Sequence, residues 1–400
     1  MSRIKKLLLL VAVLVVSSQI PFAYRRYKLY RLNNTIQRLN SERRATVEDR
    51  WSEYKGVVHV HSFLGGHSSG TFQDIITAAQ ANELQFVVMT EHAEKEIDTA
   101  AMTLQGVHEG VLFVNGNEVK SASGDRLLVL PGEGALADAA KLSTSDVLAK
   151  QRGRGALSIV AYPDEFNSWQ NSYDGLEVYN VYTNARRINP VVAFFDVLWS
   201  QRTYPDLVFA NYYQRPDQAL KKWDELLAHG KIVALAGNDS HANIGVSLNS
   251  SSGEQLLGIN LDPYQTSFHL VRIHVLLPKE KTLEAKSLLD SIKAGHFYIG
   301  FDLFGDTSGF RFEAQNGSTT VIQGDETSLQ KGLQLKVSLP ISSRLLVLKD
   351  GSTFLDEEGV TTKTVPLTER GVYRVEAFLP QLGQEVGQQY WIISNPIYVK

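Results

Sequence analysis

The run Val57–Ser62, VVHVHS, followed by Gly65–Gly70, GGHSSG, carries the strongest structural signal in the chain. An apolar run of this kind predicts a strand, and alternation along a strand places the imidazoles of His59 and His61 on one face. His67 follows the two glycines and supplies a third imidazole from a loop. Two nitrogen donors on one rigid element suit a transition metal, but two histidines on a partly solvated strand are the alternative interpretation. The choice depends on the rest of the chain.

The composition limits the classes of protein. A length of 400 residues predicts two or three domains. The 40 basic and 43 acidic residues give a net charge of −3, so we predict no nucleic-acid partner. The chain has no cysteine, which excludes disulfides and thiolate ligands. A site for a transition metal must therefore use histidine and carboxylate ligands.

The N-terminal segment is largely apolar between two groups of basic residues. Basic residues precede the run Leu7–Val16, apolar character continues to Tyr24, and the pair Arg25-Arg26 follows. This pattern predicts a signal or a membrane anchor; we favour a retained anchor, because the segment approaches the roughly 20 residues that span a bilayer and no good cleavage site stands out. A buried helix of a soluble protein is the third alternative. We expect residues 1–26 to anchor the chain, residues 27–55 to form a juxtamembrane helix or linker, and the rest to be extracytoplasmic, in the periplasm or at the cell surface.

From residue 56 onward, short apolar runs alternate with helical patterns. Each run ends in polar residues, and this alternation predicts parallel strands buried on both faces. Thr71 and Asp74 are spaced as a capping pair at the start of one helix, and the segment 217–229 is amphipathic. The expected strands are Val57–His61, Phe86–Met89, Val111–Val114, Leu157–Ala161, Leu176–Tyr179 and Ile232–Ala236.

Side chains that bind metals gather where these strands end. In a (β/α) barrel the active site is assembled at the carboxyl ends of several strands. Core packing alone does not explain so many histidines and acids at these positions. They are His59, His61, His67, His92, Glu118, Asp239 and His241. The pattern predicts one metal centre built from distant parts of the chain.

Helical signals fade after residue 305. Strand-like runs follow, separated by turn sequences such as Lys349–Ser352. They predict a small all-β, sandwich-like C-terminal domain over residues 306–400, after an α/β domain over residues 56–305.

Four motifs, in this order, resemble those of the PHP (polymerase and histidinol phosphatase) superfamily. They are His59-Val60-His61-Ser62, Thr90-Glu91-His92, Gly116-Asn117-Glu118 and Gly237-Asn238-Asp239-Ser240-His241. Segments 370–375 and 391–397 resemble the β module that follows the PHP domain in one branch of metal-dependent hydrolases. The resemblance implies a distorted (β/α)7 barrel with up to three metal ions at its C-terminal face.

The resemblance also implies a ligand set. The first ion would be held by His59, His61, Glu118 and Asp239, and a second by His67, His92 and His241. Glu118 would bridge the first ion to a middle ion.

The chain departs from the family pattern in two places. Tyr162 stands where the family has a histidine before a proline, and residues 123–127 lack a further histidine. Because the middle ion would lose both imidazoles, we expect one or two ions rather than three. Zinc, manganese and iron all suit imidazole and carboxylate ligands, so the choice among them stays open.

The expected chemistry is hydrolysis. A bound divalent metal lowers the pKa of water from 15.7 to about 7 and polarises the group under attack. We predict a phosphoesterase for a small-molecule ester, with hydrolysis of a non-phosphate ester or amide, or a non-catalytic binding protein on a degenerate barrel, as alternatives. A third hypothesis makes the β domain the working part. The expected catalytic residues are Asp239, Glu118 and His241, and the weaker candidates for substrate contacts are Tyr162, Asn180, Arg126 and Arg186.

Overall fold

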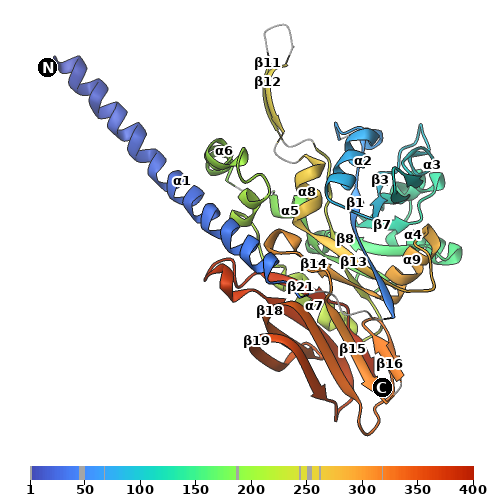
Figure 1. Ribbon diagram of the computed structural model, residues 1–400. Coiled ribbons are helices and arrows are strands. Elements are labelled where there is room, and N and C mark those ends of the chain that lie inside the picture. Colours follow the sequence, from blue (N-terminus) through green and yellow to red (C-terminus); the bar gives the residue numbers. More distant parts are fainter. Residues whose placement is uncertain are drawn as a thin grey trace.

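The computed structural model describes residues 2–44, 50–66, 68–185, 189–242, 245–249, 255–260, 263–317 and 319–400. It is a mixed α/β protein, as the sequence predicts (Figure 1). A long N-terminal helix projects from a body of helices and strands, and the C-terminal strands extend below this body.

The expected apolar runs form strands at nearly the expected positions. They are β1 (Trp51–Val60), β2 (Phe86–Met89), β5 (Val111–Val114), β8 (Leu157–Ala161), β9 (Gly175–Asn180) and β10 (Val233–Gly237). Every residue of β2, β5, β8, β9 and β10 is buried, which agrees with strands covered on both faces. The helix that follows β1, α2 (Phe72–Ala81), begins with the expected capping box between Thr71 and Asp74.

These strands belong to two sheets. In one sheet β1 pairs in parallel with β2, and β2 with β5. The other sheet has the order β10-β9-β8-β7-β6-β3, with β3 (Glu91–His92), β6 (Asn117–Lys120) and β7 (Arg126–Leu130). The six expected strands pair in parallel wherever they are neighbours. The second sheet also contains β7, which was not among the expected strands and runs antiparallel to both β6 and β8.

The two sheets meet at the ends of β1 and β10. The backbone nitrogen of Asn238 donates to the oxygen of Val58 at 2.9 Å, and that of His61 donates to the oxygen of Ser240 at 3.0 Å. On the other side of β1, the Thr90 nitrogen donates to the oxygen of Val60 at 2.8 Å. The polar segments that end β1, β2 and β10 are therefore adjacent in space.

Helices connect and cover these strands. They are α3 (Thr99–Met102), α4 (Thr144–Arg154), α5 (Val181–Ala185), α6 (Pro190–Asp196), α7 (Asp217–Leu227), α8 (Tyr264–Leu270) and α9 (Ala285–Ala294). The π-helical turn η4 (Val197–Gln201) continues α6. Strand β4 (Gly106–His108) borders β5, and β11 (Gly245–Asn249) pairs with β12 (Gln255–Asn260) in a hairpin.

The N-terminal helix α1 (Arg3–Ser41) runs without a break through the expected boundary at residue 26. Its first half is exposed and long and apolar enough to cross a membrane, judged by length and composition. Its second half buries Leu29, Leu32, Ile36 and Leu39 against the body. The 3–4 spacing of these four residues gives α1 one apolar face for this contact.

The C-terminal strands continue the sheet that contains β1. Strand β13 (Arg272–Pro278) pairs with β1, β14 (Phe297–Gly300) with β13, and β21 (Tyr390–Ser394) with β14. The path goes on through β20 (Gly371–Phe378), β18 (Gln334–Lys349), β15 (Arg311–Asn316) and β16 (Thr319–Ile322). Strand β19 (Ser352–Pro366) pairs with β18, β22 (Ile397–Val399) with β20, and β17 (Glu326–Thr327) with β22.

A separate sandwich is therefore not confirmed. Strand β1 also begins five positions before residue 56, inside the expected linker. The division of the chain into domains stays a prediction.

Candidate metal centre

The two histidines of the opening motif point into one cluster, although not by simple alternation. His59 has a left-handed backbone, with φ of 67°, and the pairing of β1 with β2 shifts register between Val58 and Val60. His61 lies beyond the last residue of β1, and its ring centroid is 5.1 Å from that of His59. The predicted outcome is confirmed, but a bulge in the strand produces it.

Two carboxylates face these imidazoles. Glu118 lies on β6, and Asp239 follows β10. Glu118 Oε2 is 3.1 Å from His59 Nε2 and 3.4 Å from His61 Nε2. Asp239 Oδ1 is 3.4 Å and 3.5 Å from the same two nitrogens. All four side chains are buried, and their potential ligand atoms lie within 4.8 Å of one another. The structure therefore brings together the four residues of the expected first site.

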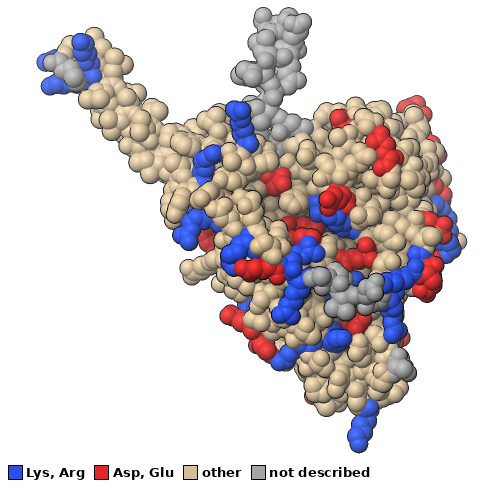
Figure 2. Space-filling view, viewed as in Figure 1, with Lys and Arg blue, Asp and Glu red and all other residues tan. Residues whose placement is uncertain are grey.

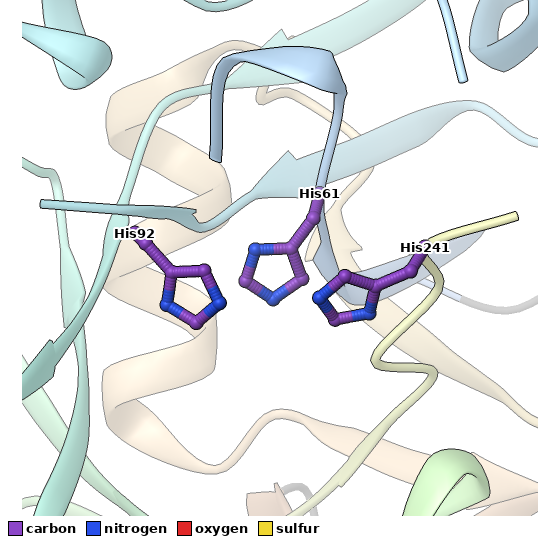
Figure 3. A group of neighbouring side chains, drawn as sticks. All are labelled: His61, His92 and His241. Carbon is purple, nitrogen blue, oxygen red and sulfur yellow. The ribbon is translucent and has the colours of Figure 1, made fainter. Parts of the chain in front are cut away.

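Three histidines form a second, overlapping group, shown in Figure 3. The ring of His61 lies between those of His92 and His241, with centroid distances of 4.6 Å and 4.2 Å. His92 comes from β3, and His241 follows β10. We expected His67 in this group, but His67 lies outside the described residues; among the described residues His61 joins His92 and His241.

The spacing of the ligand atoms fits a divalent ion. Two atoms that each lie about 2.1 Å from a zinc ion in tetrahedral arrangement are about 3.4 Å apart. The nitrogen–oxygen distances in the first group are 3.1 to 3.5 Å. Both ring nitrogens of His61 and Oδ1 of Asp239 are buried and make no hydrogen bond in the described part of the chain. Buried polar atoms without hydrogen bonds are costly, and a cation would satisfy them.

A further acid supports His59 from behind. Glu177 on β9 is fully buried, and its Oε1 is 2.7 Å from His59 Nδ1. Because a carboxylate only accepts, this contact places a proton on His59 Nδ1 and turns Nε2 toward the cluster, which is the usual arrangement behind a metal-binding histidine. The sequence prediction missed Glu177. Its only signal is a charged residue inside the apolar strand Gly175–Tyr179.

Two polar side chains hold Asp239 in place. The hydroxyl of Tyr162 donates to Asp239 Oδ2, and Asn180 Nδ2 donates to the same oxygen at 3.2 Å. Asn180 also donates to Glu177 Oε2 at 3.0 Å. Because Oδ2 accepts two hydrogen bonds, Oδ1 is the Asp239 oxygen left to face the imidazoles. Tyr162 and Asn180, two of the four candidates for substrate contact, thus bind a carboxylate of the cluster.

Arg126 occupies the outer side of Glu118. Its Nη1 donates to Glu118 Oε1, and its guanidinium lies 5.4 Å from the ring centre of Tyr162. A positive charge thus binds the carboxylate oxygen that would reach toward a middle ion. The number of ions stays a prediction. Arg186, another candidate, lies outside the described residues.

The histidines of the cluster fall into two groups by the direction in which their pKa is shifted. Burial lowers the pKa of His59, but Glu177 and Asp239 outweigh it and raise this pKa well above its usual value. For His92 and His241, burial and the neighbouring His61 lower the pKa to about 3 and about 4. His92 and His241 are therefore neutral at pH 7, the form that binds a metal. Without an ion, His59 keeps a proton on Nε2 toward Glu118, and a bound ion would displace that proton.

The acids and the tyrosine are shifted as well. The imidazoles of His59 and His61 hold the pKa of Glu118 well below its usual value despite burial, and that of Asp239 is also lowered. Burial raises the pKa of Tyr162, so the phenol keeps its proton. Both acids are thus carboxylates at neutral pH, and Tyr162 is a hydrogen-bond donor to one of them.

Glu91, the acid of the second motif, has a structural role rather than a place among the clustered side chains. Its carboxylate accepts hydrogen bonds from the backbone and hydroxyl of Ser62 and from the hydroxyl of Thr103. These bonds fix the turn that follows His61.

A cavity of about 330 Å³ adjoins the cluster. Tyr162, Glu177 and Asn180 line its inner side, and Asn184 and Arg215 also border it. A larger cavity of about 610 Å³ lies beside α1, and none of the clustered histidines lines it.

Fold and site together define a mixed α/β protein with a buried histidine–carboxylate cluster suited to divalent metal ions. No family model and no curated protein sequence matches the chain. Solved structures do match. One is a two-domain protein containing a predicted PHP-like metal-dependent phosphoesterase from Bacteroides vulgatus ATCC 8482, at 12% identity over 88% of this chain and 99% of that one, with a TM-score of 0.36.

Two other matches cover 60% of this chain. PsfC from Pseudomonas syringae PB-5123 is 14% identical over 89% of its own length, with a TM-score of 0.39. Endonuclease Q, in complex with a 27-mer duplex substrate, is 12% identical over 57% of its length, with a TM-score of 0.34. The four motifs that resemble those of the PHP superfamily meet in one cluster in the structure, and membership of that superfamily stays a prediction.

At these identities and TM-scores we carry neither a residue's role nor a substrate from the neighbours to this chain. The absence of a nucleic-acid partner stays a prediction.

Proposed function

We propose that the protein is a membrane-anchored, metal-dependent hydrolase of phosphate esters. The observation that supports this proposal most is the pair of ligand groups that share His61. One group is His59, His61, Glu118 and Asp239, and the other is His61, His92 and His241. Two overlapping groups suit one or two ions of zinc, manganese or iron.

We further propose that this site lies at the mouth of a distorted (β/α)7 barrel. The hydrogen bonds between the ends of β1 and β10 support a closed ring of strands. In this ring β2 continues into β3, and β5 continues into β6. The order would be β1, β2–β3, β5–β6, β7, β8, β9 and β10.

A divalent ion held there would lower the pKa of coordinated water and polarise the phosphoryl oxygen under attack. Asp239 would offer Oδ1 as a ligand, since Tyr162 and Asn180 hold Oδ2. Glu118 would offer Oε2, since Arg126 binds Oε1. His241, which is neutral at pH 7, would complete the second ligand group.

Arg126 is the feature that favours a phosphate ester. A guanidinium carries five N–H donors, and the contact with Glu118 uses only Nη1. About a third of the Arg126 side chain is exposed, so the remaining donors are accessible to an anionic substrate oxygen. The cavity lined by Tyr162 and Asn180 would receive the rest of a small-molecule substrate.

The test uses the purified full chain. Near-stoichiometric zinc, manganese or iron, with turnover of a generic phosphomonoester or phosphodiester, is the expected result. His61→Ala should abolish turnover, and His229→Ala, which changes an exposed histidine just after the end of α7, should not. Turnover of carboxyl esters alone would contradict the phosphoesterase assignment, and a chain that holds no metal would favour the non-catalytic alternative.

We also propose that α1 stays in the mature protein as an anchor, with the body outside the cytoplasm. The exposed apolar half of α1 supports this placement. Protease added outside intact cells or spheroplasts should then degrade the body. Protection of the body until the cells are lysed would contradict it.

A further inference from the structure

Helix α6 and the turn η4 present an apolar ridge to the solvent. The ridge consists of Val191, Phe194 and Leu198, whose exposed fractions are 64%, 48% and 64%. Their spacing of three and four residues places them on one face of the helical segment. Three large apolar side chains exposed on one face mark a contact surface.

Specific contacts hold this segment against α1. The rings of Phe22 and Phe195 are 4.8 Å apart, and Trp199 Nε1 donates to Gln19 Oε1 at 3.0 Å. Arg25 Nε donates to Asp196 Oδ1 at 2.8 Å, in a paired contact with both carboxylate oxygens. These three contacts fix α6 and η4 beside residues 19–25 of α1, as Figure 1 shows.

That level of α1 corresponds to the edge of a bilayer. About 20 helical residues, at 1.5 Å per residue, span the 30 Å hydrocarbon core. The exposed apolar part of α1 extends from Ile4 to Ile20. The exposed tyrosines at positions 24, 27 and 30 follow, together with basic residues, as is typical of a membrane–water interface. Figure 2 shows the bare apolar segment between basic side chains at its tip and at its junction with the body.

We propose that α6 and η4 form an interfacial helix that inserts the ridge Val191–Phe194–Leu198 into the lipid bilayer beside the anchor. The inference rests on the anchoring role proposed for α1. An apolar helical face at the headgroup level enters the bilayer surface by a few ångströms. The body then touches the membrane at two places, the helix α1 and this ridge. The anchor alone would leave the body free to rotate about the axis of α1, whereas two contacts fix which side faces the lipid.

The absence of cysteine makes a direct test available. Single variants Phe194→Cys, Leu198→Cys, Leu14→Cys and Val107→Cys of the full chain are labelled with an environment-sensitive fluorophore. They are then reconstituted in liposomes of phosphatidylcholine and phosphatidylglycerol that contain a spin-labelled quencher lipid. Leu14 lies in the exposed apolar half of α1, and Val107 is an exposed apolar residue of β4 that serves as the matched control.

We expect the labels at positions 194 and 198 to lose fluorescence, by an amount between that at position 14 and the absence of loss at position 107. Quenching at position 14 alone would overturn the interfacial helix and leave the anchor intact. No quenching at any position would overturn both. Fluorescence at 194 that responds to a second copy of the chain, but not to the quencher lipid, would assign the ridge to a dimer contact and overturn the proposal.

Discussion

Replacing Glu177 with glutamine tests whether the clustered histidines act as metal ligands. Glu177 makes no direct contact with the proposed ion, but its Oε1 accepts from His59 Nδ1 at 2.7 Å, and its Oε2 accepts from Asn180 Nδ2 at 3.0 Å. A glutamine has the same shape but only one accepting oxygen. Either the His59 or the Asn180 donor must then face an NH₂ group.

Asn180 cannot relieve this conflict by rotating its amide. Its Nδ2 also donates to Asp239 Oδ2 at 3.2 Å, and its Oδ1 accepts from the backbone nitrogen of Thr183 at 2.8 Å. A flip would break both bonds. One buried donor therefore loses its acceptor, which costs about 1–3 kcal/mol, and His59 loses the negative charge behind it.

The expected effect on metal affinity is large enough to measure. Loss of the partner behind a metal-binding histidine reduces affinity about tenfold to a hundredfold, or about 1.4–2.7 kcal/mol. A competition titration of the detergent-solubilised full chain against a chromophoric chelator, with zinc and with manganese, measures this change. The unfolding midpoint, recorded with and without metal, should lose most of its metal-dependent part in Glu177→Gln.

Glu53→Gln is the matched control. Glu53 is also a largely buried acid against a buried imidazole, with Oε1 at 2.9 Å from His274 Nδ1, but this pair lies between β1 and β13, away from the cluster. We expect this variant to lower the stability of the protein and to leave metal affinity unchanged. Equal metal affinity in wild type and Glu177→Gln, or an equal loss in both variants, would refute the proposed support of His59 by Glu177.

Three further predictions concern other parts of the molecule. Arg126→Met removes a positive charge from Glu118, so metal affinity should stay or rise while the turnover of phosphate esters falls at least about tenfold, measured by steady-state kinetics. Saturating zinc or manganese, at about 100 times its dissociation constant, should raise the free energy of unfolding by about 2.7 kcal/mol over the chelated protein, measured by denaturation. Burial lowers the pKa of His274, but Asp302 and Glu53 outweigh it and raise this pKa to about 9. The resulting stabilisation is complete below the usual value of 6.5 and is lost as the pH rises through about 9, so the stability difference between wild type and His274→Gln should shrink over that interval.

The sequence predicted the strands and the strand ends that carry the proposed ligands, because both signals are local. An apolar run of four to five residues followed by polar ligand types marks the end of a buried parallel strand. His92, Glu118 and Asp239 were found in this way, and the structure brings them together with His59 and His61. The sequence positions of these residues could be predicted even though the contacts between them are long-range.

The pairing of strands was less predictable. Strand β7 is a continuous apolar run like the others, and nothing in its own residues shows that it runs antiparallel to β6 and β8. The C-terminal strands likewise show no sign in their own sequence that β21 joins β14 and extends the sheet of β1. Local patterns give the existence of a strand, whereas its neighbour is set by contacts across the whole chain.

The backbone at the cluster also follows from the surroundings rather than from local preference. His59, Tyr162 and Asp239 have φ values of 67°, 50° and 48°, in the left-handed region, which histidine and aspartate adopt more often than most residues and tyrosine seldom does. The strained position is therefore Tyr162, which costs about 1–3 kcal/mol unless its environment holds it. The backbone bonds between the ends of β1 and β10 fix His59 and Asp239, and the Tyr162 hydroxyl is held by Asp239. Three left-handed residues thus meet where the proposed ligands converge, and contacts between distant parts of the chain, rather than the preference of a strand, set this geometry.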